Sequence, residues 1–222
     1  MSYTPAEVSF LMDHHEEITS LDLALTKASR LKDAEVLKEK FGDFGRAVME
    51  LVTARNSGKL PRNWLMDADS AQQATPTGVA AYRMSFLAEQ GVRTVHDLTC
   101  SIGTEGYNCP LDYFGSDLDE SRVRMARYNL SSANIFRADA LTTTTTADVL
   151  LADPARRAGG KRITRPEVLV PPLPEVVDKH RGKELAIKCA PGLDFSEWDG
   201  LVTVASVDGG VKESCLYTPG LG

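Results

Sequence analysis

One stretch of sequence decides the fold of this chain: Asp97-Leu98-Thr99-Cys100-Ser101-Ile102-Gly103-Thr104-Glu105-Gly106. It continues a short apolar segment, Thr94–Leu98, that has the pattern of a buried β-strand. A glycine-bearing turn directly after a strand lets backbone N–H groups and a helix N-terminus approach a ligand closely. In open α/β sheets, ligands bind in the crevice at the carboxyl ends of the strands. The stretch therefore predicts an α/β sheet whose first strand ends at a ligand site.

Short apolar segments with the length of β-strands continue along the rest of the chain. We expect helices between the early segments, so that those strands pair in parallel through βαβ crossovers, and Asp119 is expected to cap one of these helices. Only Asp208-Gly209-Gly210-Val211 separates the last two segments, which is a hairpin signal. The sequence thus predicts an α/β fold with a Rossmann-like, seven-stranded, mostly parallel sheet and an antiparallel last strand. The strands after the first are expected at Tyr113–Ser116, Asn134–Arg137, Asp148–Ala152, Glu184–Cys189, Leu201–Val207 and Lys212–Tyr217.

The chain in front of this sheet has a helical pattern. Thr4, Pro5 and Glu7 have the positions of an N-cap, a first-turn proline and a capping-box acid. We expect a small helical region over residues 1–59 and a ligand-binding domain over residues 60–222, in which a helix begins near Pro76 and is capped by Thr75. After the first helix, the helical region is expected to contain helices over Ser20–Leu31, Asp33–Lys40 and Phe44–Arg55.

The composition is that of an ordinary globular protein, with 222 residues of which 42% are hydrophobic and 25% charged. No apolar run reaches the roughly 18 residues of a membrane helix, and the N-terminus lacks a secretory pattern, so we expect a cytoplasmic protein without a membrane span. The four cysteines form no Cys-x-x-Cys pair and have no histidine at ligand spacing, which predicts free thiols and no metal site. The net charge of −6 argues against nucleic-acid binding by overall charge, although a local basic patch is compatible with it.

Two further acids follow predicted strand ends. Asp117 comes about 20 residues after Asp97, where a carboxylate can accept hydrogen bonds from both hydroxyls of a ribose. Asp139 ends the third strand, as a ligand or as a plain turn residue. Thr99 and Ser101 occupy positions that glycines hold in the fingerprint of dinucleotide-binding enzymes, so that fingerprint is absent. The glycine turn and the two acids predict one ligand crevice at successive strand ends.

The stretch Asp97–Gly106 resembles the first motif of many RNA methyltransferases, an acid followed by Leu-x-Cys-Gly-x-Gly, with Ser101 in place of one glycine. Seven strands that end in a hairpin also resemble the class I, Rossmann-like S-adenosylmethionine-dependent methyltransferases. The resemblance implies S-adenosyl-L-methionine as the cofactor, with Leu118 against the adenine face and Asp139 near the adenine amino group. Gln72-Gln73-Ala74-Thr75-Pro76 is similar to a segment that some of these enzymes fold over the cofactor, and a loop with a helix cap explains it equally well. The implied cofactor-binding residues are Asp97, Cys100, Gly103, Asp117, Leu118, Asp139 and Ala140.

The predicted fourth strand leads into Asp153-Pro154-Ala155-Arg156, which resembles the fourth motif of nucleic-acid methyltransferases, Asp/Asn-Pro-Pro followed by an aromatic residue or Arg. The resemblance implies that Asp153 and Pro154 position the methyl acceptor, with proline stiffening the turn. Ala155 departs from the second proline. Arg156 is similar to the arginine of RNA 5-methyluridine enzymes, which use a nucleophilic cysteine. Cys189 is the candidate for this nucleophile, but it matches their motif only in the cysteine and a proline. The alternative is that Cys189 is a buried thiol without a chemical role. The implied catalytic residues are Asp153, Pro154 and Arg156.

A basic run follows this turn. Its side chains can contact phosphate, pair with Asp153, or belong to a solvated loop. The whole pattern, with Asp153-Pro154-Ala155-Arg156-Arg157 and Lys188-Cys189-Ala190-Pro191-Gly192-Leu193-Asp194, resembles a group of bacterial RNA-methyltransferase-like proteins with a THUMP-like RNA-binding domain. The resemblance implies RNA as a partner and a further domain that this chain would lack. The run consists of Arg156, Arg157, Lys161, Arg162 and Arg165, and its candidate substrate-binding residues are Arg157, Lys161 and Arg162.

The sequence thus favours an S-adenosylmethionine-dependent methyltransferase that acts on a base in RNA. Three alternatives stay open at this stage. The negative net charge favours a small-molecule methyltransferase. The departure at Ala155 favours a catalytically inactive, cofactor-binding RNA adaptor. A nicotinamide dehydrogenase is disfavoured because its glycine fingerprint is missing.

Overall fold

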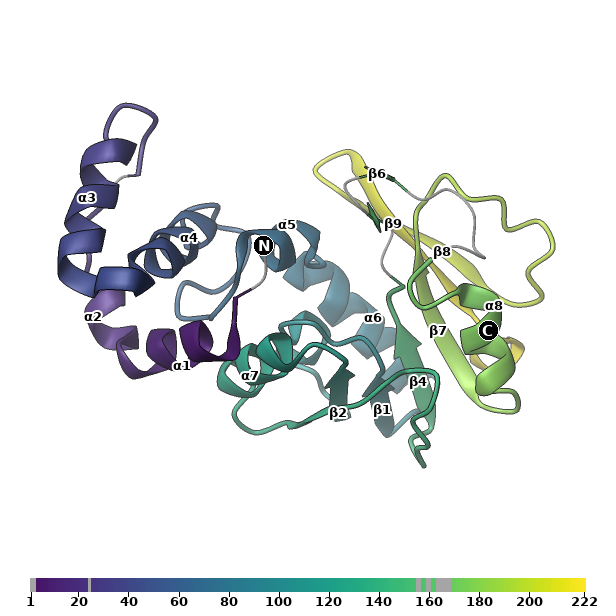
Figure 1. The fold of residues 1–222 in the computed structure, drawn as a ribbon. Helices are drawn as coiled ribbons and strands as arrows, with labels where there is room; N and C mark the ends of the chain where they lie inside the picture. Colours follow the sequence, from purple (N-terminus) through teal and green to yellow (C-terminus); the bar gives the residue numbers. More distant parts are fainter. Residues whose placement is uncertain (1–2, 24, 155–156, 159–160, 163–168) are drawn as a thin grey trace.

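The computed structural model of the chain describes residues 3–23, 25–154, 157–158, 161–162 and 169–222. Its main sheet has seven strands in the order β3-β2-β1-β4-β7-β9-β8 (Figure 1). Neighbouring strands from β3 to β7 are parallel, and β9 is antiparallel to both β7 and β8. The predicted α/β fold with an antiparallel last strand is confirmed. The strands are β1 (Thr94–Asp97), β2 (Asp112–Asp117), β3 (Asn134–Arg137), β4 (Val149–Ala152), β7 (Glu184–Cys189), β8 (Val202–Val207) and β9 (Gly210–Tyr217).

The centre of the sheet is buried on both faces. Strand β1 lies between β2 and β4, with His96 opposite Phe114 and Leu150. All residues of β4 are buried, which is expected for a parallel strand that is covered on both sides. Because β1, β2, β3, β4 and β7 are parallel, their carboxyl ends meet at one edge of the sheet. This edge is where open α/β sheets bind ligands.

Helices surround the sheet and extend the molecule at one end. Figure 1 shows the N-terminal helices α1 to α4 gathered at one end, with β7, β8 and β9 at the other. In the part of the chain that the structure describes, no helix is long and apolar enough to cross a membrane. The α-helices are α1 (Pro5–Asp13), α2 (His15–Thr19), α3 (Arg30–Phe41), α4 (Gly45–Arg55), α5 (Ala68–Gln73), α6 (Thr77–Glu89), α7 (Glu120–Asn129) and α8 (Leu173–Lys179). Shorter elements are the 3₁₀ turns η1 (Gly42–Phe44), η2 (Thr104–Gly106) and η4 (Pro219–Leu221) and the hairpin of β5 (Arg157–Ala158) and β6 (Lys161–Arg162).

The helical region and the sheet share one hydrophobic core. Leu11 of α1, Leu51 of α4, Met125 of α7 and Val95 of β1 belong to the same cluster of buried side chains. Polar contacts reinforce this packing, because the Asn129 side chain exchanges hydrogen bonds of 2.8 and 2.9 Å with the backbone of Leu65 and donates to the Ile102 carbonyl at 3.0 Å. The connecting segment before α5 is therefore fixed against α7.

The predicted first helix is confirmed with its capping box, in which the Thr4 hydroxyl accepts from the Glu7 backbone N–H. The helix predicted over Ser20–Leu31 is wrong, because α3 begins only at Arg30. Leu25 has a φ of +45°, which a helix does not tolerate. The leucines at positions 21, 23 and 25 are spaced by two residues, and these alternate side chains pack on the core.

Two other details differ from the predictions. Between β1 and β2 the chain forms only η2, and the fully described segment 138–148 between β3 and β4 contains no helix, so these crossovers are loops. Gly103, Gly106 and Pro110 disfavour a longer helix between β1 and β2.

Thr75 does not cap α6, whose N-cap is Pro76 without a side-chain hydrogen bond. The Thr75 hydroxyl instead contacts the side chain of Lys188.

Asp119 caps α7 as predicted, because its carboxylate accepts hydrogen bonds from the backbone N–H groups of Ser121 (2.8 Å) and Arg122 (3.1 Å). We expect Asp119→Ala to lower the free energy of unfolding by about 1 kcal/mol, since two N–H groups of the first turn lose their acceptor. Urea unfolding followed by circular dichroism measures the change. The exposed Asp199→Ala variant is the control, and equal stability of the two variants would contradict the expectation.

Candidate active site

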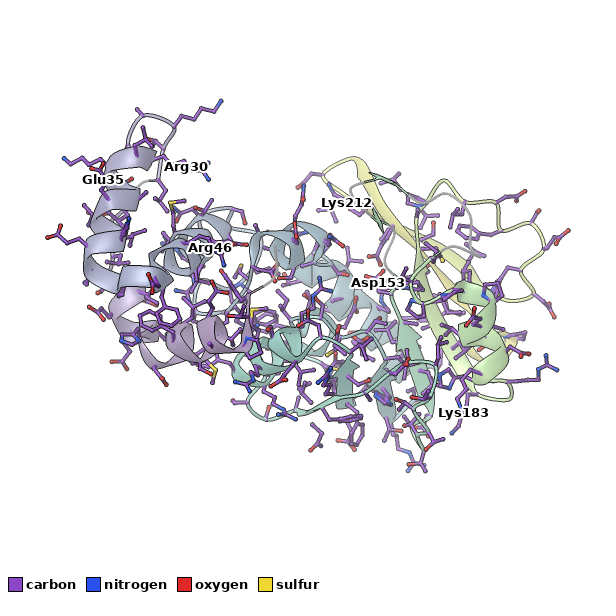
Figure 2. The ribbon with its side chains drawn as sticks, in the orientation of Figure 1. Arg30, Glu35, Arg46, Asp153, Lys183 and Lys212 are labelled. Atoms are coloured by element: carbon purple, nitrogen blue, oxygen red, sulfur yellow. The ribbon has the colours of Figure 1, made fainter. Side chains whose placement is uncertain are left out.

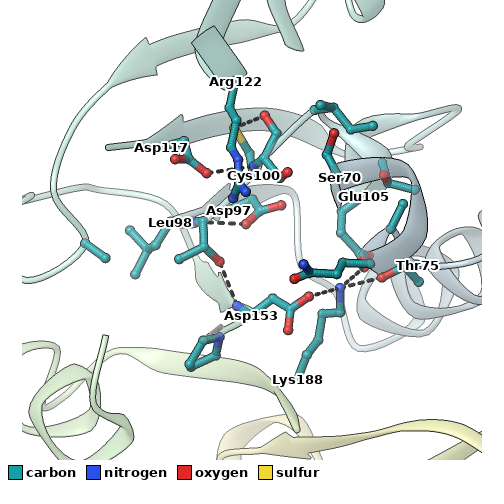
Figure 3. A pocket seen from close by; sticks show the side chains of 18 of the residues that line it. Ser70, Thr75, Asp97, Leu98, Cys100, Glu105, Asp117, Arg122, Asp153 and Lys188 are labelled. Carbon is teal, nitrogen blue, oxygen red and sulfur yellow. Dashed lines mark hydrogen bonds and ion pairs between the residues drawn. The ribbon is translucent and has the colours of Figure 1, made fainter. Parts of the chain in front are cut away.

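A pocket of about 1070 Å³ lies at the carboxyl ends of β1, β2, β3, β4 and β7 (Figure 3). The sheet topology brings residues together here that lie up to 57 positions apart in the predicted motifs, from Asp97 to Pro154. Gly103 does not line the pocket. The predicted site residues that line it are Asp97, Cys100, Asp117, Leu118, Asp139, Ala140, Asp153 and Pro154.

The turn after β1 explains why two predicted glycine positions hold other residues. Ser101 has a φ of +51°, the left-handed conformation that glycine adopts most easily, so the turn keeps a glycine-like path without the glycine. The hydroxyl of Thr99 accepts a hydrogen bond of 2.7 Å from the backbone N–H of Asp153. Gly103 has a φ of +90°, and a Cβ there would approach the Leu130 side chain to 2.6 Å. Gly103 thus shapes the turn from behind, while Thr99 ties it to the end of β4.

Asp97 is a buried carboxylate at the floor of the pocket. It accepts hydrogen bonds from the Tyr113 hydroxyl (2.9 Å) and the Thr99 backbone N–H (3.1 Å). Burial, together with the nearby Glu105 carboxylate, raises the pKa of Asp97 to about 7. Burial and the Asp97 charge also raise the pKa of the Cys100 thiol well above its ordinary value. Cys100 is therefore a neutral wall residue at physiological pH.

Asp117 is held in a fixed orientation at the end of β2. Its two oxygens accept hydrogen bonds from the backbone N–H groups of Ser101 (3.0 Å) and Asp119 (2.9 Å). Burial raises the pKa of Asp117, against the opposing effect of these hydrogen bonds and of Arg122. The next side chain, Leu118, is 61% exposed on the pocket wall, where an apolar ring can cover it.

The end of β3 supplies Asp139 and Ala140. One oxygen of Asp139 accepts from the Leu141 backbone N–H at 2.9 Å, which closes a tight turn. The ring of the buried His180 lies 2.8 Å from the Ala140 carbonyl oxygen and fixes the backbone there. Both sequence-predicted residues therefore occupy ordered positions on the pocket wall.

A buried ionic cluster, Arg83, Glu105, Lys188 and Glu213, borders the pocket beside Asp153. Arg83 pairs with Glu105 (3.2 Å) and with Glu213. Lys188 pairs with Glu105 (3.0 Å) and with Asp153 (2.7 Å), as Figure 3 shows. Burial by itself would raise the pKa of Glu105, but Arg83 and Lys188 lower it to about 2. The Glu105 carboxylate is therefore ionised at neutral pH.

Sequence reasoning missed this cluster, although two of its members carry a signal. Lys188 and Arg83 are charged residues with apolar residues beside them in their elements. Lys188 follows Leu185-Ala186-Ile187 in β7, and Arg83 stands in the same helix as the buried Ala80 and Met84. A charge in such a position must find a partner when the element is buried. The sequence alone could flag these residues, but it could not pair them.

A second group of pocket residues lies in front of the sheet. The segment 72–76, which resembled a cofactor-covering motif, lines the pocket. Lys59 donates hydrogen bonds to the carbonyls of Ala71 (3.2 Å) and Gln72 (2.9 Å), and Lys212 comes from the β8–β9 hairpin. Figure 2 shows Asp153 near the middle of the molecule and Lys212 on the hairpin beside it. Burial and the charges of Lys188 and Lys212 lower the pKa of Lys59.

Not every predicted residue can be placed. Arg156 lies outside the described residues, as do Ala155 and Arg165. Arg157, Lys161 and Arg162 belong to the backbone of the β5–β6 hairpin, and their side chains are outside the description. Cys189 is buried in the core cluster that contains Leu98 and Ile187, and it is not among the residues that line the pocket.

Among the described residues, no group of three or more His, Cys, Asp or Glu side chains could hold a metal ion. The pocket instead offers carboxylates, an apolar wall and backbone N–H groups. This set suits an organic ligand that carries hydroxyl or amino donors and an apolar ring.

No model of a known protein family matches the sequence. Two curated relatives come from Mycobacterium tuberculosis, strains CDC 1551 / Oshkosh and ATCC 25618 / H37Rv, and each is described as an uncharacterized S-adenosylmethionine-dependent methyltransferase. Each is 38% identical over a match of 207 residues, with a coverage of 83% of this chain. This chain is a homologue of S-adenosylmethionine-dependent methyltransferases. It spans 57% of the length of these methyltransferase relatives.

Solved structures agree with the methyltransferase fold. Magnesium protoporphyrin IX methyltransferase from Synechocystis PCC 6803, with bound S-adenosylmethionine, has a TM-score of 0.52 at 10% identity, over 83% of this chain and 95% of that enzyme. The same enzyme with bound S-adenosylhomocysteine has a TM-score of 0.51 at 10% identity, over 83% of this chain and 98% of that enzyme. At this identity the likeness concerns the fold. The predicted Rossmann-like methyltransferase fold is confirmed.

The raised pKa of Asp97 makes stability depend on pH in a defined direction. Because the folded protein binds the Asp97 proton more tightly than the unfolded chain does, ionisation of Asp97 costs stability as the pH rises from about 4 to about 7. Asp97→Asn cannot ionise, so the variant does not have this loss of stability. We expect the stability of Asp97→Asn relative to wild type to increase over this interval, by up to about 4 kcal/mol.

Urea unfolding of both proteins at intervals of pH measures this difference. Asp112→Asn, at the exposed start of β2, is the matched control and should show no such trend. A difference between Asp97→Asn and wild type that stays constant with pH would contradict the expectation.

Proposed function

We propose that this chain is the catalytic part of an S-adenosylmethionine-dependent methyltransferase that methylates a base in RNA. The observation that carries the proposal is that Asp153, from the Asp-Pro turn after β4, lines the same pocket as Asp117 and Asp139. The reaction type is supported by the two curated relatives. The substrate is supported by the motif at Asp153 and by the basic run that follows it.

The pocket fits the groups of S-adenosylmethionine. Asp117 would accept hydrogen bonds from the ribose hydroxyls, and its contacts with Ser101 and Asp119 fix it for this role. Leu118 would cover the adenine face, with Asp139 and the backbone of Ala140 at the adenine edge. Asp97, Cys100 and the turn shaped by Gly103 would form the floor. Pockets for small molecules have about 300–1,000 Å³, so a pocket of about 1070 Å³ leaves room for part of an acceptor beside the cofactor.

Placement of the acceptor is the protein's main task in this chemistry. When bound, S-adenosylmethionine supplies a methyl group that its positive sulfonium activates. The carboxylate of Asp153 would accept a hydrogen bond from the acceptor base, and Pro154 restricts the backbone of the turn. Since the Asp153 N–H donates to Thr99, the turn cannot shift relative to the end of β1. Such alignment is what an in-line displacement requires.

Positive side chains beside the acceptor turn support RNA as the substrate. The β5–β6 hairpin, with Arg157, Lys161 and Arg162, starts three residues after Pro154, and Lys59 and Lys212 line the pocket. The forked guanidinium of arginine and the ammonium of lysine contact phosphates, and such contacts set the register of a protein on a nucleic acid. With a net charge of −6 on the whole chain, phosphate contacts would be confined to this local patch.

Two wider assignments belong to the same proposal. The chain would divide into a helical region, residues 1–59, and a cofactor domain, residues 60–222. A cytoplasmic location is supported by the cysteines, all of which are free thiols.

Removal of the ribose acid tests the cofactor site. We expect Asp117→Ala to weaken the binding of S-adenosylhomocysteine at least tenfold, because the ribose hydroxyls lose a charged acceptor worth about 1.5–3 kcal/mol. Isothermal titration calorimetry measures the affinity. Asp112→Ala, at the other end of the same strand, should bind as wild type does, and equal affinity of Asp117→Ala would remove Asp117 from the cofactor site.

Transfer of label tests the substrate. We expect tritium from S-adenosyl-[methyl-³H]methionine to enter RNA extracted from cells that lack the gene, and Asp153→Ala to reduce the initial rate at least a hundredfold, because the acceptor is no longer aligned. The exposed Glu197→Ala is the control variant. Incorporation into a low-molecular-weight extract but not into RNA would favour a small-molecule methyltransferase. Binding of RNA and cofactor without any transfer would favour an inactive adaptor.

A further inference from the structure

Lys188 occupies an unusual place for a lysine, near the carboxyl end of a buried parallel strand. Its side chain is only 4% exposed, and its Nζ atom lies 2.7 Å from Oδ2 of Asp153 and 3.0 Å from Oε1 of Glu105. It also donates to the hydroxyl of Thr75. Figure 3 shows Lys188 reaching up from β7 to these three side chains. One cation therefore pairs with two carboxylates at the same time, the buried Glu105 and the more exposed Asp153.

The charges of the ion-paired groups themselves do not cancel. Their ion pairs join two cations, Arg83 and Lys188, to three carboxylates, those of Glu105, Glu213 and Asp153. Glu105 and Glu213 are nearly inaccessible, with side chains 4% exposed, whereas the Asp153 side chain is 28% exposed toward the pocket. Asp153 is therefore the most exposed carboxylate of these ion pairs, and Lys188 is the cation that pairs with it.

Lys188 stays protonated. Burial by itself would lower the pKa of Lys188, but the carboxylates of Asp153, Glu105 and Glu213 outweigh burial and raise it above the ordinary value for lysine. A lysine in this state cannot act as a base toward the acceptor. It acts as a fixed positive charge and a hydrogen-bond donor.

Asp153 is held from two sides. Its backbone N–H donates to Thr99, and its Oδ2 is bound to Lys188. Within the part of the chain that the structure describes, no hydrogen bond reaches the other oxygen, Oδ1. A carboxylate that is anchored through one oxygen has a defined orientation in which it can accept a hydrogen bond.

We propose that Lys188 is a positioning residue that acts through Asp153: it anchors the Asp153 carboxylate and offsets its charge beside the transferred methyl group. This inference rests on the proposed function, because it takes Asp153 to lie next to the sulfonium of the cofactor. A free carboxylate at that place would stabilise the positive sulfonium of the reactant more than the neutral thioether of the product. Lys188 limits this stabilisation, so that the acceptor site holds its base without trapping the reactant cofactor.

The affinity ratio of S-adenosylmethionine to S-adenosylhomocysteine reports this charge without any need for a methyl acceptor. The two ligands differ in the methyl group and in the positive charge at sulfur. Calorimetric titration with both ligands at one pH gives the ratio for each variant. A lysine with only a structural role would weaken both ligands alike and leave the ratio unchanged.

We expect Lys188→Met to shift the ratio about tenfold toward S-adenosylmethionine, because the Asp153 charge is no longer offset. Asp153→Asn is expected to shift it in the opposite direction, and the charge-balanced pair Lys188→Met/Asp153→Asn to return it to within about threefold of wild type. Lys188→Arg keeps the charge and should keep the wild-type ratio. Lys183→Met, just before β7 and outside the pocket, is the matched control.

If Lys188→Met does not fold, Lys188→Gln replaces it, since its amide can still donate to a carboxylate, and the same shift is expected. An unchanged ratio in the folded neutral variant, with both ligands bound, would overturn the inference and leave the proposed function intact. Failure of the wild-type protein to bind either ligand would overturn both. Absence of methyl transfer to RNA, by contrast, would affect only the proposed substrate.

Discussion

The buried ion pairs of Lys188 are the constraint on which the site depends. A charge taken out of water costs several kcal/mol unless it meets a partner of opposite sign, and removal of one partner from such a pair costs about 3–5 kcal/mol. Lys188 on β7 must therefore face Glu105 on η2 and Asp153 at the end of β4, and Arg83 on α6 must face Glu105 and Glu213 on β9. The elements that carry these side chains cannot shift independently. The edge of the sheet where the pocket lies is thus its most tightly specified part.

The turn after β1 shows how the same edge is built without the expected glycines. A non-glycine residue in the left-handed conformation costs about 1–2 kcal/mol. Ser101 adopts that conformation, and its backbone N–H donates to the Asp117 carboxylate. A hydrogen bond to a charged group contributes about 1.5–3 kcal/mol, which offsets the strain. Thr99 adds a contact that glycine could not make, because its hydroxyl accepts from the backbone of Asp153.

The helical region contributes to the site indirectly. Its helices share a hydrophobic core with α7 and β1, so the connecting segment 60–67 has a fixed path between them. This path leads into α5 and the residues 72–76 that close the front of the pocket. Lys59, at the start of the path, holds two carbonyls of that closing segment. The front wall of the pocket is therefore placed by packing that lies far from the strand ends.

The sequence by itself determined the strands, their mostly parallel arrangement and the acids at their ends. Local patterns are sufficient for this, because apolar strand segments and the turns that follow them, such as Asp97 to Gly103, carry their signal within about ten residues. It missed the non-helical segment before α3, where Leu21, Leu23 and Leu25 pack at alternate positions although their composition favours a helix. Only the tertiary structure decided the partners of Lys188, because ion pairs between β7, η2 and the end of β4 join residues up to 83 positions apart in the sequence, from Glu105 to Lys188. No local sequence pattern links residues so far apart. Burial makes the pairing obligatory, and burial exists only in the folded chain.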